Sequence, residues 1–358
     1  LKRDKMKINS NIDSIVIYEN VSIIDAMSKL NISYDKTLFV VSKENKLLGS
    51  LTDGDLRRSI ITGADLHSSI SSLYNKDPHY LVENEFDKES LDVMFLQDDF
   101  KVIPIISSRK NIIGCISAKD HMNIETYIDK VNIPVVIMAG GKGSRLKPFT
   151  DILPKPLIPL DGKAIIEHII DKFILYGSNS IYLTLNYKNK LIKAFFDDLE
   201  KDFDVDFVDE EIELGTAGGL KLLSDKIDST FFLSNCDVLV DVNLSDFYKI
   251  HKENNNLITV IVSTMKHIFP YGSCELDSDG KLKNIKEKPQ TNHLVNTGFY
   301  IMSSEIFKYI PDGEMYDMPK LILDVINDGH KVGVYPISED SWTDIGQWPE
   351  YYKASEKF

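Results

Sequence analysis

The stretch VVIMAGGKGSRLKPFTDILPKP, from Val135 to Pro156, decides how the larger part of this chain folds. Its apolar, β-branched start, Val135 to Met138, predicts a strand that is buried on both faces of a parallel sheet. Three glycines follow, and their missing Cβ atoms let a sharply turned backbone direct N–H groups at phosphate oxygens. Arg145 and Lys155 add positive charge, and the prolines on both sides of Lys155 hold it in a stiff, non-helical segment. The stretch therefore predicts a site for a phosphorylated ligand.

Two better-known glycine loops are excluded by the same residues. A Walker A loop requires Lys-Ser or Lys-Thr after its last glycine, but Gly143 is followed by Ser144 and Arg145. The dinucleotide fingerprint requires a third glycine at the position of Leu146. The stretch instead contains every fixed position of the pattern GGxGxRLxPxTxxxPKP, and it resembles the signature of the sugar-1-phosphate nucleotidyltransferases.

The resemblance implies roles for this loop and for a second glycine-rich segment, EEIELGTAGGL at 210–220. Arg145 would steady the β- and γ-phosphates of a nucleoside triphosphate, and Lys155 would hold its α-phosphate or the incoming phosphate. The nucleotide-binding residues that it implies are Ala139, Gly140, Gly141, Gly143, Ser144, Glu210, Gly215 and Thr216. A carboxylate of the second segment would accept both the N1–H and the N2 amino group of guanine. The sequence leaves open which of Glu210, Glu211 and Glu213 points inward.

Two aspartates are candidates for a metal site. Asp237 ends the strand-like segment FFLSNCD, and Asp344 lies in WTDIGQWPEYY, which is similar to the WxDIGxPxxY endings of the family. Attack of one phosphate on another brings anions together, and Mg²⁺, which prefers carboxylate and phosphate oxygens, would offset their repulsion. We therefore expect Mg²⁺ on Asp237 and Asp344, although Asp237 alone also fits a strand-end turn. Cys236 is expected to be a small buried residue and not a nucleophile.

Three further segments match those that surround the sugar phosphate in the family. They are Tyr271-Gly272, Glu287-Lys288-Pro289 and Asn296-Thr297-Gly298. By resemblance, Lys288 would bind the phosphate, Glu287 and Asn296 would hydrogen-bond sugar hydroxyls, and Gly272 would admit the ring. Any one of them alone also fits a turn, so the prediction depends on finding all three in family order.

The first third of the chain contains an internal repeat. The pattern of Gly49, Thr52 and Asp55 in GSLTDGD recurs 65 positions later, in GCISAKD, as Gly114, Ser117 and Asp120. Each copy follows a helix-like stretch and two strand-like stretches, and the pair resembles two cystathionine-β-synthase (CBS) motifs, together a Bateman module. The resemblance implies that Thr52, Asp55, Ser117 and Asp120 bind a regulatory nucleotide, commonly an adenine nucleotide. The same residues also fit helix caps, and capping does not exclude ligand contact.

These patterns predict the domain organisation. A tandem CBS domain of the α+β class is expected over 8–125, a linker over 126–133, and a catalytic domain over 134–358. From position 134 onward, apolar strands alternate with amphipathic helical stretches, which predicts an α/β, Rossmann-like, doubly wound sheet. In such sheets the ligand lies beyond the carboxyl ends of the strands.

Composition excludes several classes of protein. A net charge of −14 over 358 residues argues against a nucleic-acid binder. The three cysteines form no CxxC pair, which indicates a reducing compartment. No apolar run approaches the roughly 20 residues that span a bilayer, so no membrane partner is expected and the cytoplasm is predicted. Because Bateman pairs often dimerise, we expect a homo-oligomer.

The resemblance implies a reaction. An oxygen of a sugar-1-phosphate would attack the α-phosphorus of a nucleoside triphosphate, giving a nucleotide sugar and pyrophosphate. A Bateman module before this domain resembles the guanylyltransferases that make GDP-amino sugars for bacterial legionaminic acid, which favours GTP and glucosamine-1-phosphate. Mannose-1-phosphate or a heptose-1-phosphate with GTP, and UTP, dTTP or CTP, remain alternatives. The non-enzymatic alternative is a nucleotide sensor whose transferase domain is inactive.

Overall fold

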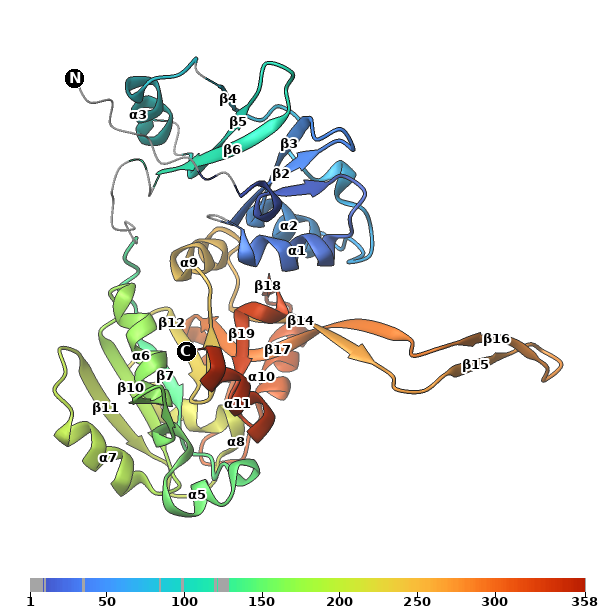
Figure 1. The fold of residues 1–358 in the computed structure, drawn as a ribbon. Helices are drawn as coiled ribbons and strands as arrows, with labels where there is room; N and C mark the ends of the chain where they lie inside the picture. Colours follow the sequence, from blue (N-terminus) through green and yellow to red (C-terminus); the bar gives the residue numbers. More distant parts are fainter. Residues whose placement is uncertain are drawn as a thin grey trace. The chain divides into compact units, whose positions relative to one another are not determined.

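The computed structural model describes residues 9, 11–33, 36–83, 85–97, 100–118, 121 and 129–357 (Figure 1). Its internal contacts divide the chain into two compact units. One comprises Leu1–Tyr127 with Thr264–His293, and the other comprises Ile128–Ser263 with Leu294–Phe358. The first three residues of the predicted linker, 126–128, lie outside the described residues, so the linker stays a prediction.

A seven-stranded sheet forms the centre of the second unit, in the order β11-β10-β7-β12-β17-β14-β18. The strands are β7 (Val135–Met138), β10 (Ser180–Leu185), β11 (Asp204–Asp209), β12 (Phe231–Asn235), β14 (Ile258–Ile268), β17 (Gln290–Met302) and β18 (Val332–Ile337). Strand β7 pairs in parallel with both β10 and β12, whereas β17 pairs antiparallel with β12. The α/β, doubly wound fold is thus confirmed, with one antiparallel strand inserted in the sheet.

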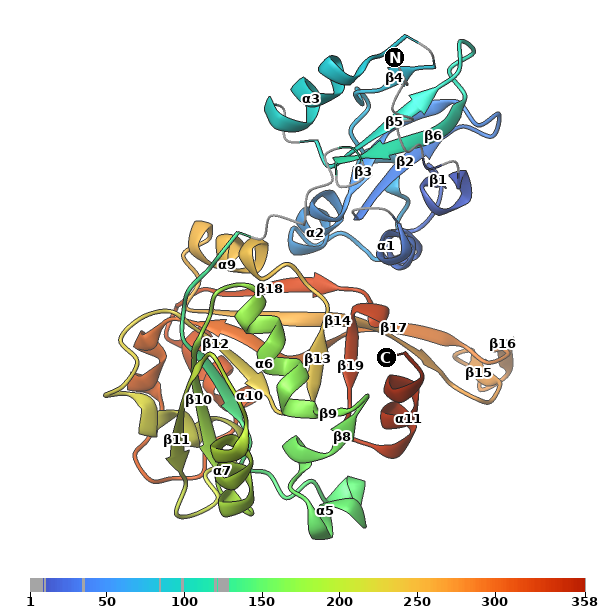
Figure 2. The same ribbon diagram turned by 60° about the vertical axis from the view of Figure 1, so that its left-hand side comes forward.

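Helices cover both faces of this sheet (Figure 2). They are α6 (Ile165–Leu175), α7 (Asn189–Asp198), α8 (Gly215–Gly218), α9 (Leu244–Glu253), α10 (Met318–Asn327) and α11 (Trp348–Lys357). The short α5 (Phe149–Ile152) contributes no residue to either of the two core clusters against this sheet. Val135 and Ile137 belong to the core cluster that includes α6, α7 and α9, and Val136 belongs to the cluster that includes α8 and α10. Successive residues of a strand point to opposite faces, so this division shows β7 buried on both sides, as its composition predicts.

Two short strand pairs complete the second unit. Strand β13 (Val238–Val240) pairs antiparallel with β19 (Trp342–Asp344), and β8 (Pro159–Leu160) pairs with β9 (Lys163–Ala164). The first pair joins segments that are about a hundred residues apart in the sequence. It is therefore the element that brings the end of the chain to the end of β12.

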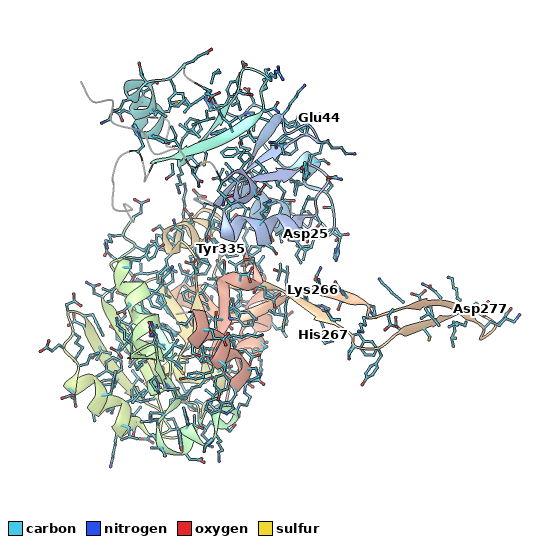
Figure 3. The ribbon with its side chains drawn as sticks, viewed as in Figure 1. Asp25, Glu44, Lys266, His267, Asp277 and Tyr335 are labelled. Carbon is cyan, nitrogen blue, oxygen red and sulfur yellow. The ribbon has the colours of Figure 1, made fainter. Side chains whose placement is uncertain are left out.

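Strands β14 and β17 continue into the Thr264–His293 segment, which is a two-stranded ribbon. Beyond them, β15 (Ser273–Leu276) pairs antiparallel with β16 (Leu282–Lys286). Lys266, His267 and Asp277 mark this ribbon in Figure 3. All five residues of β16 and three of the four residues of β15 are exposed.

The other elements of the first unit form two half-units. The first contains β1 (Val16–Tyr18), α1 (Ile23–Ile32), β2 (Thr37–Val41), β3 (Leu47–Thr52) and α2 (Asp53–Ile61); the second contains β4 (Leu81–Val82), α3 (Lys88–Gln97), β5 (Val102–Ile106) and β6 (Ile112–Ser117). The bounds of α3, β5 and β6 are those of α1, β2 and β3 displaced by 65 positions. Each half forms a three-stranded sheet, β1-β2-β3 or β4-β5-β6.

The two half-units contact each other through equivalent residues. The Leu47 N–H donates to the Lys110 carbonyl at 3.1 Å, and the Ile112 N–H donates to the Asn45 carbonyl at 3.2 Å. The two bonds are equivalent after a displacement of 65, because Leu47 corresponds to Ile112 and Asn45 corresponds to Lys110, and such a reciprocal pair is the pattern of an approximate two-fold axis. Residues of both halves also share one core cluster, including Phe39, Val41, Val102 and Ile112. A half-unit by itself leaves part of its sheet exposed, and packing against the other half-unit buries that part.

Candidate active site

The glycine loop after β7 is held by a backbone hydrogen bond to β10 and by close packing at Gly143. The Ala139 N–H donates to the Thr184 carbonyl at 2.9 Å, which holds the start of the loop on β10. Gly143 has a φ of 61°, and a Cβ at this position would lie 2.9 Å from Thr150 Cγ2 and 3.0 Å from Lys155 Cβ. Glycine is therefore required here both by the left-handed backbone and by the close packing. The 3₁₀ turn Ser144–Leu146 follows directly and carries Arg145.

A cavity of about 400 Å³ opens where β7, β10 and β12 end. Its lining contains ten of the predicted residues: Gly140, Gly141, Gly143, Ser144, Arg145, Lys155, Glu210, Gly215, Thr216 and Asp237. Ala139 is buried beneath the loop and holds it through its backbone. Parallel strands present their carboxyl ends at this edge, which is where ligands bind in sheets of this type.

Asp237 and Asp344 come together through the short sheet of β13 and β19. Val238 pairs with Asp344 in the register of that sheet, and the Ile345 N–H donates to the Asp237 carbonyl at 2.8 Å. The Asp237 carboxylate forms an ion pair with the buried Lys155 ammonium. The positive charge of Arg145 also acts on this pair of aspartates, and by itself it lowers the pKa of Asp344.

The Asp344 carboxyl is not fully satisfied. Its Oδ1 atom is buried and has no hydrogen-bond partner among the residues that the structure describes. Burial raises the pKa of Asp344, and the nearby charge of Asp237 raises it further. A Cβ on Gly346 would lie 2.7 Å from this oxygen, so the glycine of the DIG motif is needed for the turn to pack against the carboxylate.

This donor set fits Mg²⁺. Across the described part of the chain, no group of three or more His, Cys, Asp and Glu residues is arranged to hold a metal by itself. Mg²⁺ is commonly held by one or two carboxylates, with water and substrate phosphates as its other ligands. A pair of carboxylates with one unpartnered buried oxygen, beside a glycine loop, is suited to that mode of binding. The magnesium site stays a prediction.

Of the three glutamates in the second glycine-rich segment, Glu210 and Glu213 line the cavity, and Glu210 is the one that is partly buried. Its carboxylate lies against two glycines, because a Cβ on Gly219 would be 2.5 Å from Glu210 Oε1 and a Cβ on Gly140 would be 3.4 Å from it. Burial raises the pKa of Glu210. Glu211 is exposed, and Glu213 lies at the rim, where it pairs with Lys142 at 3.2 Å.

Several cavity residues were missed by the sequence analysis. Thr184, Asn186 and Asn235 lie at the ends of β10 and β12 and line the cavity. The rule that ligands bind beyond strand ends was sufficient to predict them. Met315 and Asp317 also line it, but they come from a loop about a hundred residues beyond the second glycine-rich segment. No local pattern predicts their presence there.

The acceptor residues divide between the ribbon and the sheet. Gly272 and Glu287 are neighbours on the ribbon, since a Cβ on Gly272 would lie 3.0 Å from Glu287 Oε2, and Lys288 follows with a φ of 44°. These three residues belong to the first unit and are not among the described residues that line the cavity. Asn296 is not among the described lining residues either. Its Oδ1 atom accepts from the Gly298 N–H at 2.9 Å, and its Nδ2 atom donates to the Tyr300 hydroxyl at 2.8 Å.

The NTG segment nevertheless packs against the floor of the site. Gly298 has a φ of 79°, and a Cβ there would lie 2.3 Å from Asn235 Nδ2. Asn235 lines the cavity two residues before Asp237. Cys236, between them, is buried, and burial raises the pKa of its thiol to about 12. Since a thiolate is the reactive form of cysteine, this residue is not suited to nucleophilic attack.

In the repeat, Thr52 and Asp55 form a capping box at the start of α2. The Asp55 Oδ2 atom accepts from the Thr52 N–H at 2.8 Å and from the Thr52 hydroxyl at 2.7 Å, and the Asp55 N–H donates to that hydroxyl at 3.3 Å. Ser117 is buried at the end of β6, and Asp120 lies outside the described residues. The capping role is realised at Thr52, and nucleotide binding by these residues stays a prediction.

Two known families match parts of this chain. Residues 134–358 match the Nucleotidyl transferase family, and residues 8–62 match the CBS domain. The chain therefore belongs to the Nucleotidyl transferase family and carries an N-terminal CBS domain. The family match covers only the first half of the repeat, and the likeness of the second half depends on the 65-residue displacement and the shared fold.

Individual relatives differ in their nucleotide. A UTP–glucose-1-phosphate uridylyltransferase of Synechocystis is 31% identical over 244 residues, 61% of each chain. A mannose-1-phosphate guanyltransferase of Hypocrea jecorina is 30% identical over 233 residues, 62% of each chain. The chain thus spans about three fifths of these relatives. A Bacillus anthracis structure, described as a glucose-1-phosphate thymidylyltransferase with a sucrose, is 19% identical with a TM-score of 0.51, covers 63% of this chain and 94% of its own, and supports the fold.

In the described part of the chain, no helix combines the length and the apolar character that crossing a bilayer requires.

Proposed function

We propose that this protein transfers a nucleoside monophosphate from a nucleoside triphosphate to a sugar-1-phosphate. One observation carries the proposal: a single cavity contains the glycine loop with Arg145, the Lys155–Asp237 pair and the Glu210 carboxylate. Asp344 lies directly behind it, at the partner position of Val238. The cavity thus offers a phosphate site between a candidate metal site and a candidate base site. The family match over 134–358 supports the same reaction.

The reaction requires positioning and charge neutralisation. A P–O bond forms between an oxygen of the sugar-1-phosphate and the α-phosphorus, and the bond from that phosphorus to the β-phosphate oxygen breaks, releasing pyrophosphate. The attacking oxygen is already ionised at neutral pH, so the chain needs neither a general base nor a nucleophile. Arg145 would offset the charge on the departing phosphates, and Lys155 would orient the α-phosphate. Mg²⁺, held by Asp237 and Asp344, would supply further charge neutralisation when bound.

Glu210 is the residue on which we base the choice of GTP. A buried carboxylate can accept two hydrogen bonds, and guanine offers two adjacent donors, its N1–H and its N2 amino group. Uracil and thymine present only one donor, N3–H, between two carbonyl acceptors, which face the carboxylate unfavourably. The raised pKa of Glu210 indicates that its charge lacks full compensation within the chain. A base with two donors would provide that compensation.

The test is pyrophosphate release, screened across GTP, UTP, dTTP, CTP and ATP with several sugar-1-phosphates. We expect turnover with GTP to exceed turnover with every other triphosphate. Glu210→Gln should lower kcat/KM for GTP by about 10-fold or more, because the amide offers one acceptor in place of two. Glu211→Gln, at the exposed neighbouring position, is the control and should leave the preference unchanged. A preference for any of the other four triphosphates in the parent protein would reject the choice of GTP.

The sugar half of the proposal is glucosamine-1-phosphate, as in the legionaminic acid guanylyltransferases that the sequence resembles. Mannose-1-phosphate and heptose-1-phosphate are the alternatives in the same screen. Gly272, Glu287, Lys288 and Asn296 are the residues we assign to the acceptor. Lys288→Ala should raise KM for the sugar phosphate far more than KM for the triphosphate, and an equal rise in both would reject the role of Lys288.

Regulation by a nucleotide on the CBS half-units, a homo-oligomeric state and a cytoplasmic location complete the proposal. Cys236 and Cys274 are free thiols in the described part of the chain, which suits a reducing compartment. Calorimetric titration of the full chain with adenine nucleotides should detect binding that Asp55→Ala abolishes. Absence of binding would remove the regulatory role and leave the transferase activity as proposed.

A further inference from the structure

The turn Asn186–Lys188, between β10 and α7, contacts several parts of the site. Lys188 has a φ of 53°, an uncommon backbone conformation for a residue other than glycine. Its ammonium donates to three consecutive backbone carbonyls: Thr150 at 3.3 Å, Asp151 at 2.6 Å and Ile152 at 2.8 Å. An ammonium has three N–H donors, so this geometry uses all of them. The carbonyls are those that the short α5 leaves without helical partners.

These carbonyls lie at the C-terminal end of the segment 140–152, which contains the glycine loop and α5 and is called the phosphate loop below. The Thr150 side chain is buried, and its hydroxyl donates to the Gly143 carbonyl at 3.0 Å. Thr150 also fills the space that a Cβ on Gly143 would need. The position of Thr150 therefore sets the position of Gly143, and Arg145 follows two residues later.

The same turn holds the near end of the loop. The Tyr187 N–H donates to the Gly140 carbonyl at 3.2 Å, and the Tyr187 hydroxyl donates to the Thr150 carbonyl at 3.2 Å. The Asn186 amide donates to the Glu210 carbonyl at 2.8 Å. Three consecutive residues thus connect both ends of the phosphate loop with the segment that carries Glu210.

We propose that Lys188 is a positioning residue for phosphate binding, which acts by fixing the Thr150–Ile152 carbonyls and, through Thr150, the Gly143–Arg145 turn. The inference rests on the proposed transferase activity. Displacing a catalytic group by about 1 Å costs on the order of 10²-fold in rate. A flexible glycine loop can be displaced in this way unless both of its ends are held.

Three variants of the full chain test this role: Lys188→Met removes the ammonium at similar length, Lys188→Arg keeps a cationic donor, and Lys190→Met alters an exposed lysine of the same helix. In Lys188→Met we expect kcat to fall by about 10²-fold and KM for the triphosphate to rise, while KM for the sugar phosphate changes by less than about 3-fold. Lys188→Arg should recover most of the loss. Lys190→Met should behave as the parent.

Amide hydrogen exchange without substrates gives a second readout that does not depend on activity. Exchange over 140–152 should be faster in Lys188→Met than in the parent, and exchange in α6 should be unchanged. If Lys188 only stabilised the fold, the unfolding temperature would fall while kcat and both KM values of the folded enzyme stayed the same. That result, or unchanged exchange over 140–152, would overturn the proposal.

The outcomes separate this inference from the proposed function. A parent protein without turnover on any triphosphate would reject the transferase activity, whereas hydrogen exchange and triphosphate binding would still decide the role of Lys188. If Lys188→Met does not fold, Lys188→Gln is the deciding variant, because its amide has two N–H donors in place of the three that bind the Thr150, Asp151 and Ile152 carbonyls. A triphosphate KM equal to that of the parent in a folded Lys188→Gln would then overturn the proposal.

Discussion

Two aspartates, one in each unit, differ in how fully their carboxylate oxygens are hydrogen-bonded. The Asp55 carboxylate, in the CBS half-unit, accepts from the Thr52 backbone and hydroxyl and pairs with Arg58 at 2.5 Å. Asp344, behind the cavity, has a buried oxygen without a partner in the described structure and a pKa that burial raises. Both residues belong to a short motif that the sequence analysis assigned to ligand binding.

The difference indicates what each residue does without its ligand. Asp55 already contributes to stability, because its hydrogen bonds complete the first turn of α2. Asp344 is left with an unsatisfied buried oxygen, which costs free energy until a partner arrives. Functional sites commonly reduce stability in this way. The comparison predicts that changes at the cavity reduce activity more than stability, and that changes at the cap do the reverse.

The largest effect is expected at Asp237. Asp237→Asn should reduce Mg²⁺-dependent turnover by at least about 10³-fold, because the site loses half of its carboxylate charge where anions must approach. The variant should still fold, although its unfolding temperature should fall because the buried Lys155 ammonium loses its ion pair. Asp241→Asn, in the same segment but exposed, is the control and should keep full activity. Near-normal turnover of Asp237→Asn would contradict the metal assignment.

A methyl group at Gly346 should have the next largest effect. The Cβ of Gly346→Ala would lie 2.7 Å from Asp344 Oδ1, so the carboxylate must move away from its position beside Asp237. We expect kcat to fall by about 10²-fold, measured by pyrophosphate release at saturating substrates. A variant that keeps the parent's kcat would show that the position of Asp344 does not matter to turnover.

The raised pKa of Asp344 predicts a pH dependence of stability. The folded protein binds the proton of the Asp344 carboxyl more tightly than the unfolded chain does. Protonation of Asp344 therefore contributes to the free energy of unfolding at low pH. This contribution is lost as the pH rises from about 3.9, the pKa of Asp in the unfolded chain, through the raised pKa of Asp344 in the folded protein. Asp344→Asn removes this loss. Urea unfolding of both proteins from pH 4 to pH 7 should therefore show a smaller decline in the variant, which should also be inactive. Parallel curves would contradict the unsatisfied state of Asp344.

The smallest effect is expected at the helix cap. Thr52→Ala removes the hydroxyl of the capping box and should lower the free energy of unfolding by about 1 kcal/mol. Turnover without added adenine nucleotide should not change, and Thr52→Ser should keep most of the stability. Loss of turnover in Thr52→Ala would mean that the cap communicates with the cavity, and the contrast with Asp344 would then fail.

Much of the fold and of the phosphate site could be predicted because the signals are local. The β-branched run of β7, the glycines after it and the 65-residue repeat each lie within one stretch of chain, and each appears in the structure as predicted. The antiparallel insertion of β17 was not predicted. Its direction depends on the ribbon between β14 and β17, and no residue pattern within either strand records it.

The cavity was predicted only in part. Met315 and Asp317 reach it through the packing of a distant loop, and Lys188 reaches the phosphate loop only because β10 lies beside β7. Glu210 could not be chosen over Glu211 and Glu213 before the positions of Gly140 and Gly219 were known.

The sequence by itself determined the family, the order of the elements and the residue types of the site. These follow from spacing along one chain, which is where glycine conformation, strand alternation and helix capping are encoded. Only the tertiary structure decided which groups meet: Asp237 with Asp344 through β13 and β19, Lys155 with Asp237, and Lys188 with the carbonyls of α5. Such contacts join segments distant in sequence, and their existence depends on the packing of the whole sheet.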